Sequence, residues 1–255
     1  MTIDPRLAAV ADQQPYPLVF ATVSGAHLYG FESADSDWDL RGVHVLPLPE
    51  VVGLVTGPET ITVSSDDGGL DLDLVTHDIR KFCALLLKPN GYVLEQLHSP
   101  LVIAGGDSHD ELRDLSQGCI TSRHAHHYLG FADTQWQLFE KTGSQGLKPL
   151  LYVFRVLKTG IRLMRTSEVE ANLTNLLNDD PVIEYLPELI DAKKSGGEHA
   201  TIDGTGVDRY RQDIDHLREV LQYEQSTTKL ATEPTARAAL NDFVIRTRLA
   251  TRERR

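Results

Sequence analysis

Apolar residues follow two different periods along this chain. From residue 18 to residue 75 they form short runs or alternate with polar residues, a pattern typical of β-strands. It predicts strands at residues 18–23, 37–46, 61–63 and 70–75, joined in one mixed sheet. The residues before them, 1–17, contain Pro5, Pro15 and Pro17 and are expected to form a short helix or arm.

After the last predicted strand, apolar residues recur at helical spacing. A helix is expected from Thr76 as its N-cap, another around Val93, and from about residue 108 helix follows helix. The clearest helical stretches are residues 120–141 and 147–165, and residues 194–206 are expected to form a flexible loop. Two further helices are expected at about residues 207–225 and 233–250. The sequence therefore predicts an α/β (α+β) fold, with a small mixed-sheet core over residues 1–106 and an α-helical domain over residues 107–255.

The predicted strand at residues 37–46 carries two carboxylates. Asp37, Asp39 and Arg41 alternate there with Trp38 and Leu40, and a period of two puts the charged side chains on one face. Two neighbouring carboxylates repel each other unless a cation lies between them. Because oxygen ligands suit Mg²⁺ or Mn²⁺, we expect a divalent metal at Asp37 and Asp39.

A glycine turn precedes this strand. Gly25 follows the apolar run 18–23, and the segment after it is too short for a full helix. Glycine lets the backbone approach phosphate oxygens, and free N–H groups at a helix start attract anions. A glycine turn followed by Asp-x-Asp on the next strand therefore predicts phosphate binding beside the expected metal.

Composition and charge narrow the location and the partners. The chain has 255 residues, of which 41% are hydrophobic and 24% charged, as in ordinary globular proteins. It contains two cysteines, its start does not resemble a signal peptide, and no apolar run approaches the roughly 20 residues of a membrane span. We therefore expect a cytoplasmic protein without a membrane partner. The net charge of −12 argues against a broad nucleic-acid coat, yet basic residues cluster at 148–165 and 246–255.

The order of strand, glycine turn, loop and Asp-x-Asp strand resembles the nucleotidyltransferase superfamily of DNA polymerase beta. A bacterial and phage subgroup, some of whose members are RNA-ligase-associated nucleotidyltransferases, is a closer match over residues 18–98. The matching segments are Gly25-Ala26-His27-Leu28-Tyr29-Gly30 and Ser36-Asp37-Trp38-Asp39-Leu40-Arg41. One position departs from the pattern, because Ala26 stands where the subgroup has serine.

The resemblance implies roles for further residues. Asp71 and Asp73 share the acidic face of their strand, and the subgroup pattern favours Asp73 as the third catalytic carboxylate and metal ligand. It also implies an NTP site formed by Ser24, Gly25, Ala26, His27, Arg41, Lys148, Arg155 and Lys158.

Simpler interpretations of these residues stay open. From the sequence alone, Arg41 is equally a partner for a carboxylate, and His27 is equally an ordinary helix-start residue. Lys148, Arg155 and Lys158 equally form a generic basic helix face.

The activity implied by the resemblance is metal-dependent transfer of a nucleoside monophosphate from an NTP to a hydroxyl. Two divalent ions about 3.5–4 Å apart would stabilise the attacking and leaving oxygens. RNA is the first expected acceptor, consistent with RNA repair, and a protein side chain or a small molecule is the alternative. A degenerate nucleotide-binding regulatory protein is the non-enzymatic alternative, which Ala26 favours and the intact carboxylates oppose. The base preference and the oligomeric state are not specified by the sequence.

Overall fold

The computed structural model describes residues 3–67, 70–141, 143–203 and 205–253. Contacts within the chain divide it into two compact units, each assembled from separate stretches. The first unit comprises residues 1–24, 37–119 and 233–255, and the second comprises residues 25–36 and 120–232. Independent domains at 1–106 and 107–255 stay a prediction.

The first unit is built on a five-stranded sheet with the order β3-β4-β2-β1-β5. Its strands are β1 (Leu18–Val23), β2 (Trp38–His44), β3 (Thr60–Asp67), β4 (Leu70–Asp78) and β5 (Val102–Ala104). β2 and β4 run parallel, whereas the other neighbours are antiparallel. The predicted mixed sheet is therefore confirmed. The pattern missed β5, because three residues are too few to show a period.

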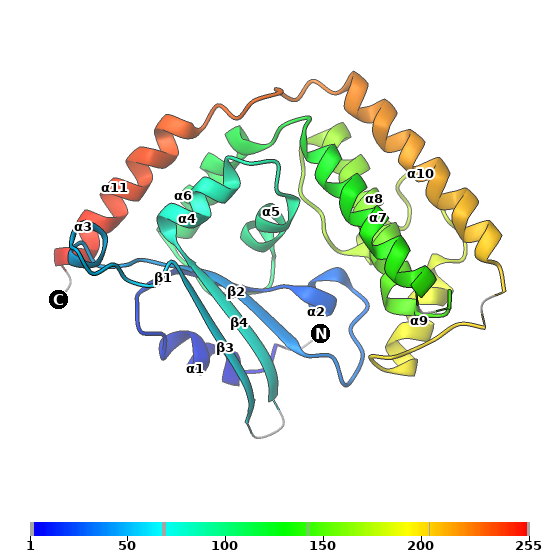
Figure 1. The fold of residues 1–255 in the computed structure, drawn as a ribbon, viewed down its shortest axis with the longest axis horizontal. Helices are drawn as coiled ribbons and strands as arrows, with labels where there is room; N and C mark the ends of the chain where they lie inside the picture. Colours follow the sequence, from blue (N-terminus) through cyan, green and yellow to red (C-terminus); the bar gives the residue numbers. More distant parts are fainter. Residues whose placement is uncertain (1–2, 68–69, 142, 204, 254–255) are drawn as a thin grey trace. The chain divides into compact units, whose positions relative to one another are not determined.

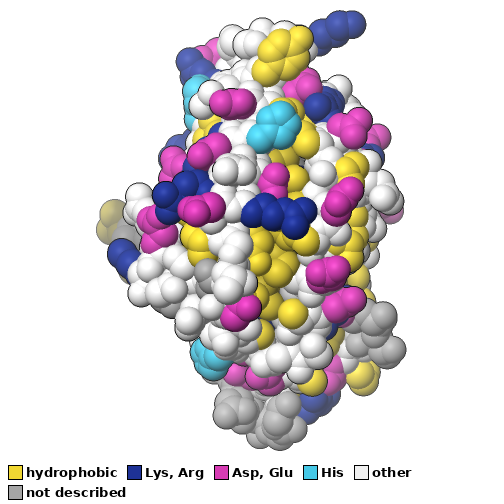
Figure 2. All heavy atoms as spheres, turned by 90° about the vertical axis from the view of Figure 1, so that its right-hand side faces the viewer, with side chains coloured by type: hydrophobic (Ala, Val, Ile, Leu, Met, Phe, Trp, Pro, Cys, Tyr) yellow, Lys and Arg dark blue, Asp and Glu magenta, His cyan; other side chains and the backbone are white. Residues whose placement is uncertain are grey.

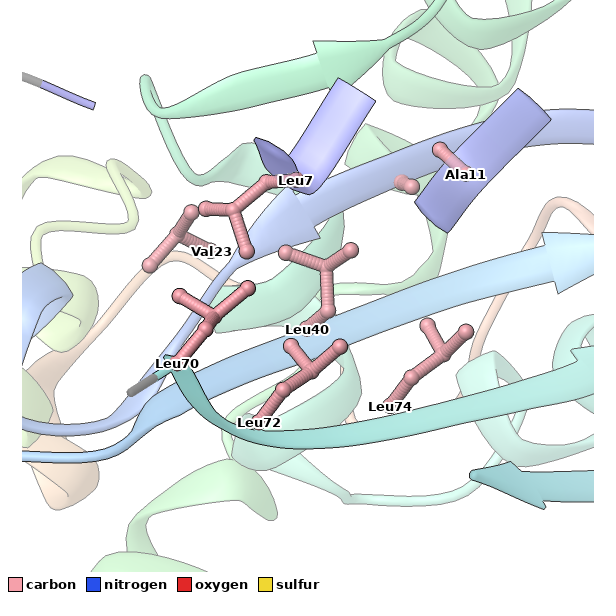
Figure 3. Packing of buried hydrophobic residues seen from close by; sticks show 8 residues of the cluster. Leu7, Ala11, Val23, Leu40, Leu70, Leu72 and Leu74 are labelled. Carbon is pink, nitrogen blue, oxygen red and sulfur yellow. The ribbon is translucent and has the colours of Figure 1, made fainter. Parts of the chain in front are cut away.

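One face of the sheet forms an apolar core cluster with α1 (Arg6–Asp12). Figure 3 shows the side chains of this cluster, which include Leu7, Ala11, Val23, Leu40, Leu70, Leu72 and Leu74. The alternation in β4 follows from this packing, since its leucines are buried while the aspartates between them are not. Burial of apolar surface contributes about 25 cal/mol per Å², so the register of β4 is strongly specified.

The other face of the sheet is covered by α4 (Ile79–Leu86), α5 (Gly91–His98) and α6 (Asp107–Ser116), as Figure 1 shows. Phe20 of β1 stacks on His109 with ring centroids 4.7 Å apart. The prediction of Thr76 as the N-cap of α4 was wrong, because β4 continues to Asp78. Asp78 is the N-cap instead, and its carboxylate accepts from the N–H of Arg80 at 3.0 Å. The unit is completed by α3 (Pro49–Val52), the 3-10 helix η1 (Gln117–Cys119) and α11 (Arg237–Glu253), which contacts α4 and α6.

The second unit consists of helices. α8 (Leu147–Thr166) lies beside both α7 (His124–Lys141) and α10 (Val207–Thr227) (Figure 1). The remaining elements are α2 (Gly25–Tyr29), the 3-10 helix η2 (Leu173–Leu176) and α9 (Leu186–Gly196). The predicted loop at residues 194–206 is shorter than expected, because α9 continues to Gly196. None of the described helices combines the length and the apolar character that crossing a bilayer requires.

Candidate active site

Asp39 and Asp73 occupy the same level on two neighbouring strands. Their Cα atoms are partners in the parallel pairing of β2 with β4, and neighbouring strands lie about 4.8 Å apart. Both alternate with leucines of the apolar core, so their side chains project from the face opposite α1. The fold therefore brings together two carboxylates that are 34 positions apart in the sequence.

The guanidinium group of Arg41 joins the two carboxylates. Its Nη2 donates to Asp39 Oδ1 at 2.6 Å and to Asp73 Oδ2 at 3.0 Å, and Nη1 donates to the main-chain oxygens of Leu40 and Asp73 at 2.9 and 2.7 Å. In this structure Arg41 is thus the counter-ion of the carboxylates. A contact between Arg41 and a triphosphate stays a prediction.

The surroundings of Arg41 favour its charged form. Burial opposes the charge, but Tyr92 of α5 and the carboxylates of Asp39 and Asp73 outweigh that effect and raise the pKa of Arg41 above its ordinary value. Its side chain is 11% exposed, compared with 20% for Asp39 and 38% for Asp73. The carboxylates are therefore reachable from solvent, whereas the guanidinium that balances them is largely enclosed.

This donor set fits a divalent cation in its chemistry. Two carboxylates that already hold a cation between them supply the oxygen ligands that Mg²⁺ or Mn²⁺ prefers. Among the described residues, no three histidine, cysteine, aspartate or glutamate side chains lie close enough together to hold a metal ion. Asp37 lies just before β2 and does not complete such a cluster in this arrangement.

Asp71 differs from Asp73 although both alternate with the same leucines. Asp71 is exposed, and its Cα partner on β3 is Asp66. The Cα partner of Asp73 on β2 is instead Asp39, and the Asp73 carboxylate accepts a hydrogen bond from Arg41. The geometry thus distinguishes the two aspartates in the same way as the resemblance does.

The predicted nucleotide loop begins at the end of β1. Ser24 is fully buried, and its N–H donates to the main-chain oxygen of Asp39 at 2.8 Å. In the second unit Gly25 opens the five-residue helix α2 with a φ of 61°, a conformation that favours glycine. Ala26 and His27 of α2 are both buried. The glycine turn is therefore observed, and phosphate binding by it stays a prediction.

The three basic residues expected on one helix face have different environments on α8. Arg155 is buried with its guanidinium carbon 3.8 Å from the ring centroid of Tyr29, so it packs against α2. Lys158 is also buried and donates to the main-chain oxygens of Asp179 and Pro181 at 2.8 and 3.1 Å. Burial lowers the pKa of Lys158 to about 8. Lys148 is partly exposed and forms an ion pair with Glu198.

Other residues of the two basic clusters are also engaged in ion pairs. Arg162 and Arg165 of α8 pair with Asp179, Glu168 and Glu224, and Arg246 of α11 pairs with Glu111 and Asp242. Arg248 is buried and bonded to Asp78, and Arg254 and Arg255 lie outside the described residues. On the surface in Figure 2, acidic side chains lie between the basic ones. The described residues thus offer a weaker basic path than their clustering in the sequence indicated.

Lys193 is a buried charged residue that was not predicted from the sequence. It is fully buried at the C-terminal end of α9, where its ammonium group is 3.0 Å from Glu198 Oε2. A signal was present, because Lys193 completes the helical spacing of Leu186, Leu189 and Ile190 on the buried face of α9. A lysine on such a stripe needs a polar partner supplied by the fold.

A family match over most of the chain agrees with the signature. Residues 1–246 match a family described as the RNA repair pathway DNA polymerase beta family, RlaP. The chain is 29% identical over 176 residues to the uncharacterized protein MJ0002 of Methanocaldococcus jannaschii, which covers 67% of this chain and 71% of that protein. A solved structure of a nucleotidyltransferase-like protein from Exiguobacterium sibiricum has a TM-score of 0.30 and 13% identity, covering 86% of this chain and 72% of that one. The family match includes the signature and nearly all of both units, and it confirms the resemblance.

Proposed function

We propose a function from one premise: the chain belongs to the RNA repair pathway DNA polymerase beta family, RlaP. The proposed reaction is transfer of a nucleoside monophosphate from an NTP to a hydroxyl group, with loss of pyrophosphate. The observation that carries this proposal is the pairing of Asp39 with Asp73 around Arg41.

The carboxylates of this pair are proposed as ligands of divalent cations, with Asp37 as an additional ligand. When bound, the cations would stabilise the attacking and leaving oxygens of the transferred phosphoryl group. Asp39 and Asp73 are held at one level by the β2–β4 ladder, so their oxygens are positioned before any ligand arrives. Arg41 balances their charge in the absence of metal. Its Nη1 is held in place because it donates to the main-chain oxygens of Leu40 and Asp73.

An RNA end is the proposed acceptor. The description of the family supports RNA repair, and the net charge of −12 favours recognition of an end over coating of a long strand. A protein side chain or a small molecule is the alternative acceptor. The cytoplasm is the proposed location.

The test is incubation with Mg²⁺ and each α-labelled NTP, in separate reactions with RNA, with protein alone and with small hydroxyl compounds. Transfer of label to RNA that requires both Mg²⁺ and the Asp39 and Asp73 carboxylates is the expected result. Transfer of label to the protein itself or to a small molecule would show that this molecule, and not RNA, is the acceptor. No transfer from any NTP, with either Mg²⁺ or Mn²⁺, would favour the regulatory alternative.

A further inference from the structure

A buried ammonium group lies in the second unit without an equally buried anion. Lys193 has no exposed side-chain surface, and its Nζ lies 2.9 Å from Ser33 Oγ, 3.1 Å from Gly197 O and 3.0 Å from Glu198 Oε2. Removing an ammonium ion from water costs several kcal/mol, which only close polar partners offset. The site around Lys193 is therefore built to hold an anion.

The carboxylate of Glu198 lies between two ammonium groups. Its Oε2 accepts from Lys193 and its Oε1 accepts from Lys148, so both ammonium groups bond the same carboxylate. Ser36 Oγ lies 3.4 Å from Oε2, and Ser33 Oγ is 3.0 Å from Ser36 Oγ. Lys193 also donates to Ser33 Oγ and Gly197 O, so Glu198 is the charged acceptor in the hydrogen bonds described for the two lysines.

The other carboxylate near this cluster is used differently. Asp35 accepts from the main-chain N–H of Glu198 at 3.0 Å, and that bond is the first cause of the lowered pKa of Asp35. Asp35 therefore fixes the backbone of the loop at Glu198. A bond from the Ser33 hydroxyl and the charge of Lys193 lower the pKa of Asp35 further, although no hydrogen bond between its carboxylate and Lys148 or Lys193 is seen among the described contacts.

The loop that carries Glu198 allows its side chain to leave. The loop is anchored beyond Glu198, where Leu147 N–H donates to Ala200 O at 3.1 Å and Ile202 N–H donates to Gln145 O at 2.9 Å. The side chains of Lys148 and Glu198 are 37% and 21% exposed. A rotation of the Glu198 side chain towards solvent would thus uncover both ammonium groups and leave the backbone anchors intact.

We propose that Lys148 and Lys193 form a phosphate-binding pair, and that Glu198 occupies it as an internal anion when no nucleotide is bound. The inference rests on the proposed function, since the ligand it assigns is the phosphate tail of an NTP. A phosphate group offers more charge and more acceptor oxygens than a carboxylate, and the hydroxyls of Ser33 and Ser36 match these additional oxygens. Binding of the tail would displace Glu198.

The test uses inorganic tripolyphosphate as the probe, without metal, and measures its affinity by calorimetry for the full chain. Glu198→Gln removes the competing charge but retains a side-chain oxygen for the lysines, so we expect about tenfold tighter binding. Glu188→Gln is the matched control, because Glu188 is exposed on α9, the helix that precedes the Glu198 loop, and its loss changes the net charge equally. Equal or weaker binding by Glu198→Gln than by Glu188→Gln would overturn the proposal.

A second variant covers the case in which Glu198→Gln fails to fold. Lys148→Met leaves the buried Lys193–Glu198 pair in place, and it should weaken tripolyphosphate binding at least about tenfold. A purely structural network would leave that affinity unchanged, and such a result would also overturn the proposal. Nucleotide transfer by the wild-type chain is measured separately, so failure of the phosphate site and failure of the proposed activity are distinguishable.

Discussion

Asp39 and Asp73 are partners across the parallel strands β2 and β4, and Arg41 bonds both of their carboxylates. Like charges at this spacing would repel strongly without a cation. Arg41 provides that cation from the protein itself, and the same geometry would admit a divalent ion. Metal binding and the ion pairs of Arg41 are therefore expected to be coupled.

The carboxylate pair leads to the first prediction. Asp39→Asn and Asp73→Asn should each reduce nucleotide transfer by at least about a hundredfold, because each removes charge where the phosphoryl group would react. Asp71→Asn is the control, since Asp71 lies on the same strand but is exposed and has a different partner. The measurement is the single-turnover rate with Mg²⁺. An equal loss in Asp71→Asn would contradict the assignment of Asp73.

The role of Arg41 as an internal cation gives the second prediction. Arg41→Met should lower the free energy of unfolding by about 2 kcal/mol without metal, because it leaves two close carboxylates unbalanced. Saturating Mg²⁺ should recover most of that loss, since a ligand at 100 times its Kd stabilises by about 2.7 kcal/mol. Urea unfolding with and without Mg²⁺ measures both effects.

Arg80→Met serves as the control for this prediction. Arg80 forms an exposed ion pair with Glu59, and such pairs contribute about 0–1 kcal/mol. The loss of unfolding free energy in Arg80→Met should therefore be small and independent of Mg²⁺. If Mg²⁺ stabilised Arg41→Met no more than Arg80→Met, the two cations would not share a site.

Ala26 leads to the third prediction. The family serine would add a hydroxyl donor at the start of α2, and a well-made charge-assisted hydrogen bond contributes roughly 1.5–3 kcal/mol. Ala26→Ser should therefore tighten NTP binding about tenfold, measured as the Kd in Mg²⁺. Ala34→Ser is the control, because Ala34 is exposed in the polar loop that follows. An unchanged or weaker affinity in Ala26→Ser would count against phosphate binding by this turn.

The strands and the main helices were predictable because one face of each is buried. The leucines of β4 alternate with aspartates and pack in one cluster with α1, and that alternation is visible in the sequence. The pairing of Asp39 with Asp73 was only implied by resemblance, because the register of strands distant in sequence leaves no local pattern. Lys193 lies on a helical stripe that is visible in the sequence, but its contact with Glu198 leaves no local pattern, since it depends on how a loop meets the start of α8.

Charge clustering was the least reliable signal. Arg248 belongs to the basic C-terminal cluster, yet the fold buries it against Asp78. Lys158 likewise donates to main-chain oxygens instead of facing solvent. The sequence shows where charges are, but their pairing follows from tertiary contacts.

The buried pair of Arg248 and Asp78 gives the fourth prediction. Arg248 Nη2 lies 2.5 Å from Asp78 Oδ1, and Nη1 donates to the main-chain oxygen of Leu46 at 2.9 Å. Arg248→Met leaves a buried carboxylate uncompensated and should destabilise by about 3–5 kcal/mol. Arg246→Met, two residues earlier with exposed ion pairs, should destabilise far less, because solvent screens such pairs. Urea denaturation measures the free energy of unfolding of both variants. Similar losses in the two would contradict a stabilising role for the buried Arg248–Asp78 pair.

The fifth prediction concerns acid stability through His98 of α5. Burial, with smaller effects from Arg113 and His109 of α6, lowers the pKa of His98 from 6.5 to about 4. Between these two pKa values the unfolded chain binds more protons at His98 than the folded chain does. The stability contributed by neutral His98 is therefore present above pH 6.5 and is lost as the pH falls towards 4. The slope for one such group is at most about 1.4 kcal/mol per pH unit.

His98→Gln should make the free energy of unfolding fall less steeply over this range. Glutamine retains a polar group near Ser116 Oγ, which lies 2.7 Å from His98 Nε2, but it cannot take up the proton. His216→Gln is the matched control, because His216 is exposed on α10, and its slope should equal that of the wild type. Urea titrations at several pH values from 7 down to 4 measure the slopes. Parallel curves for His98→Gln and the wild type would show that His98 is not the group whose protonation opposes folding.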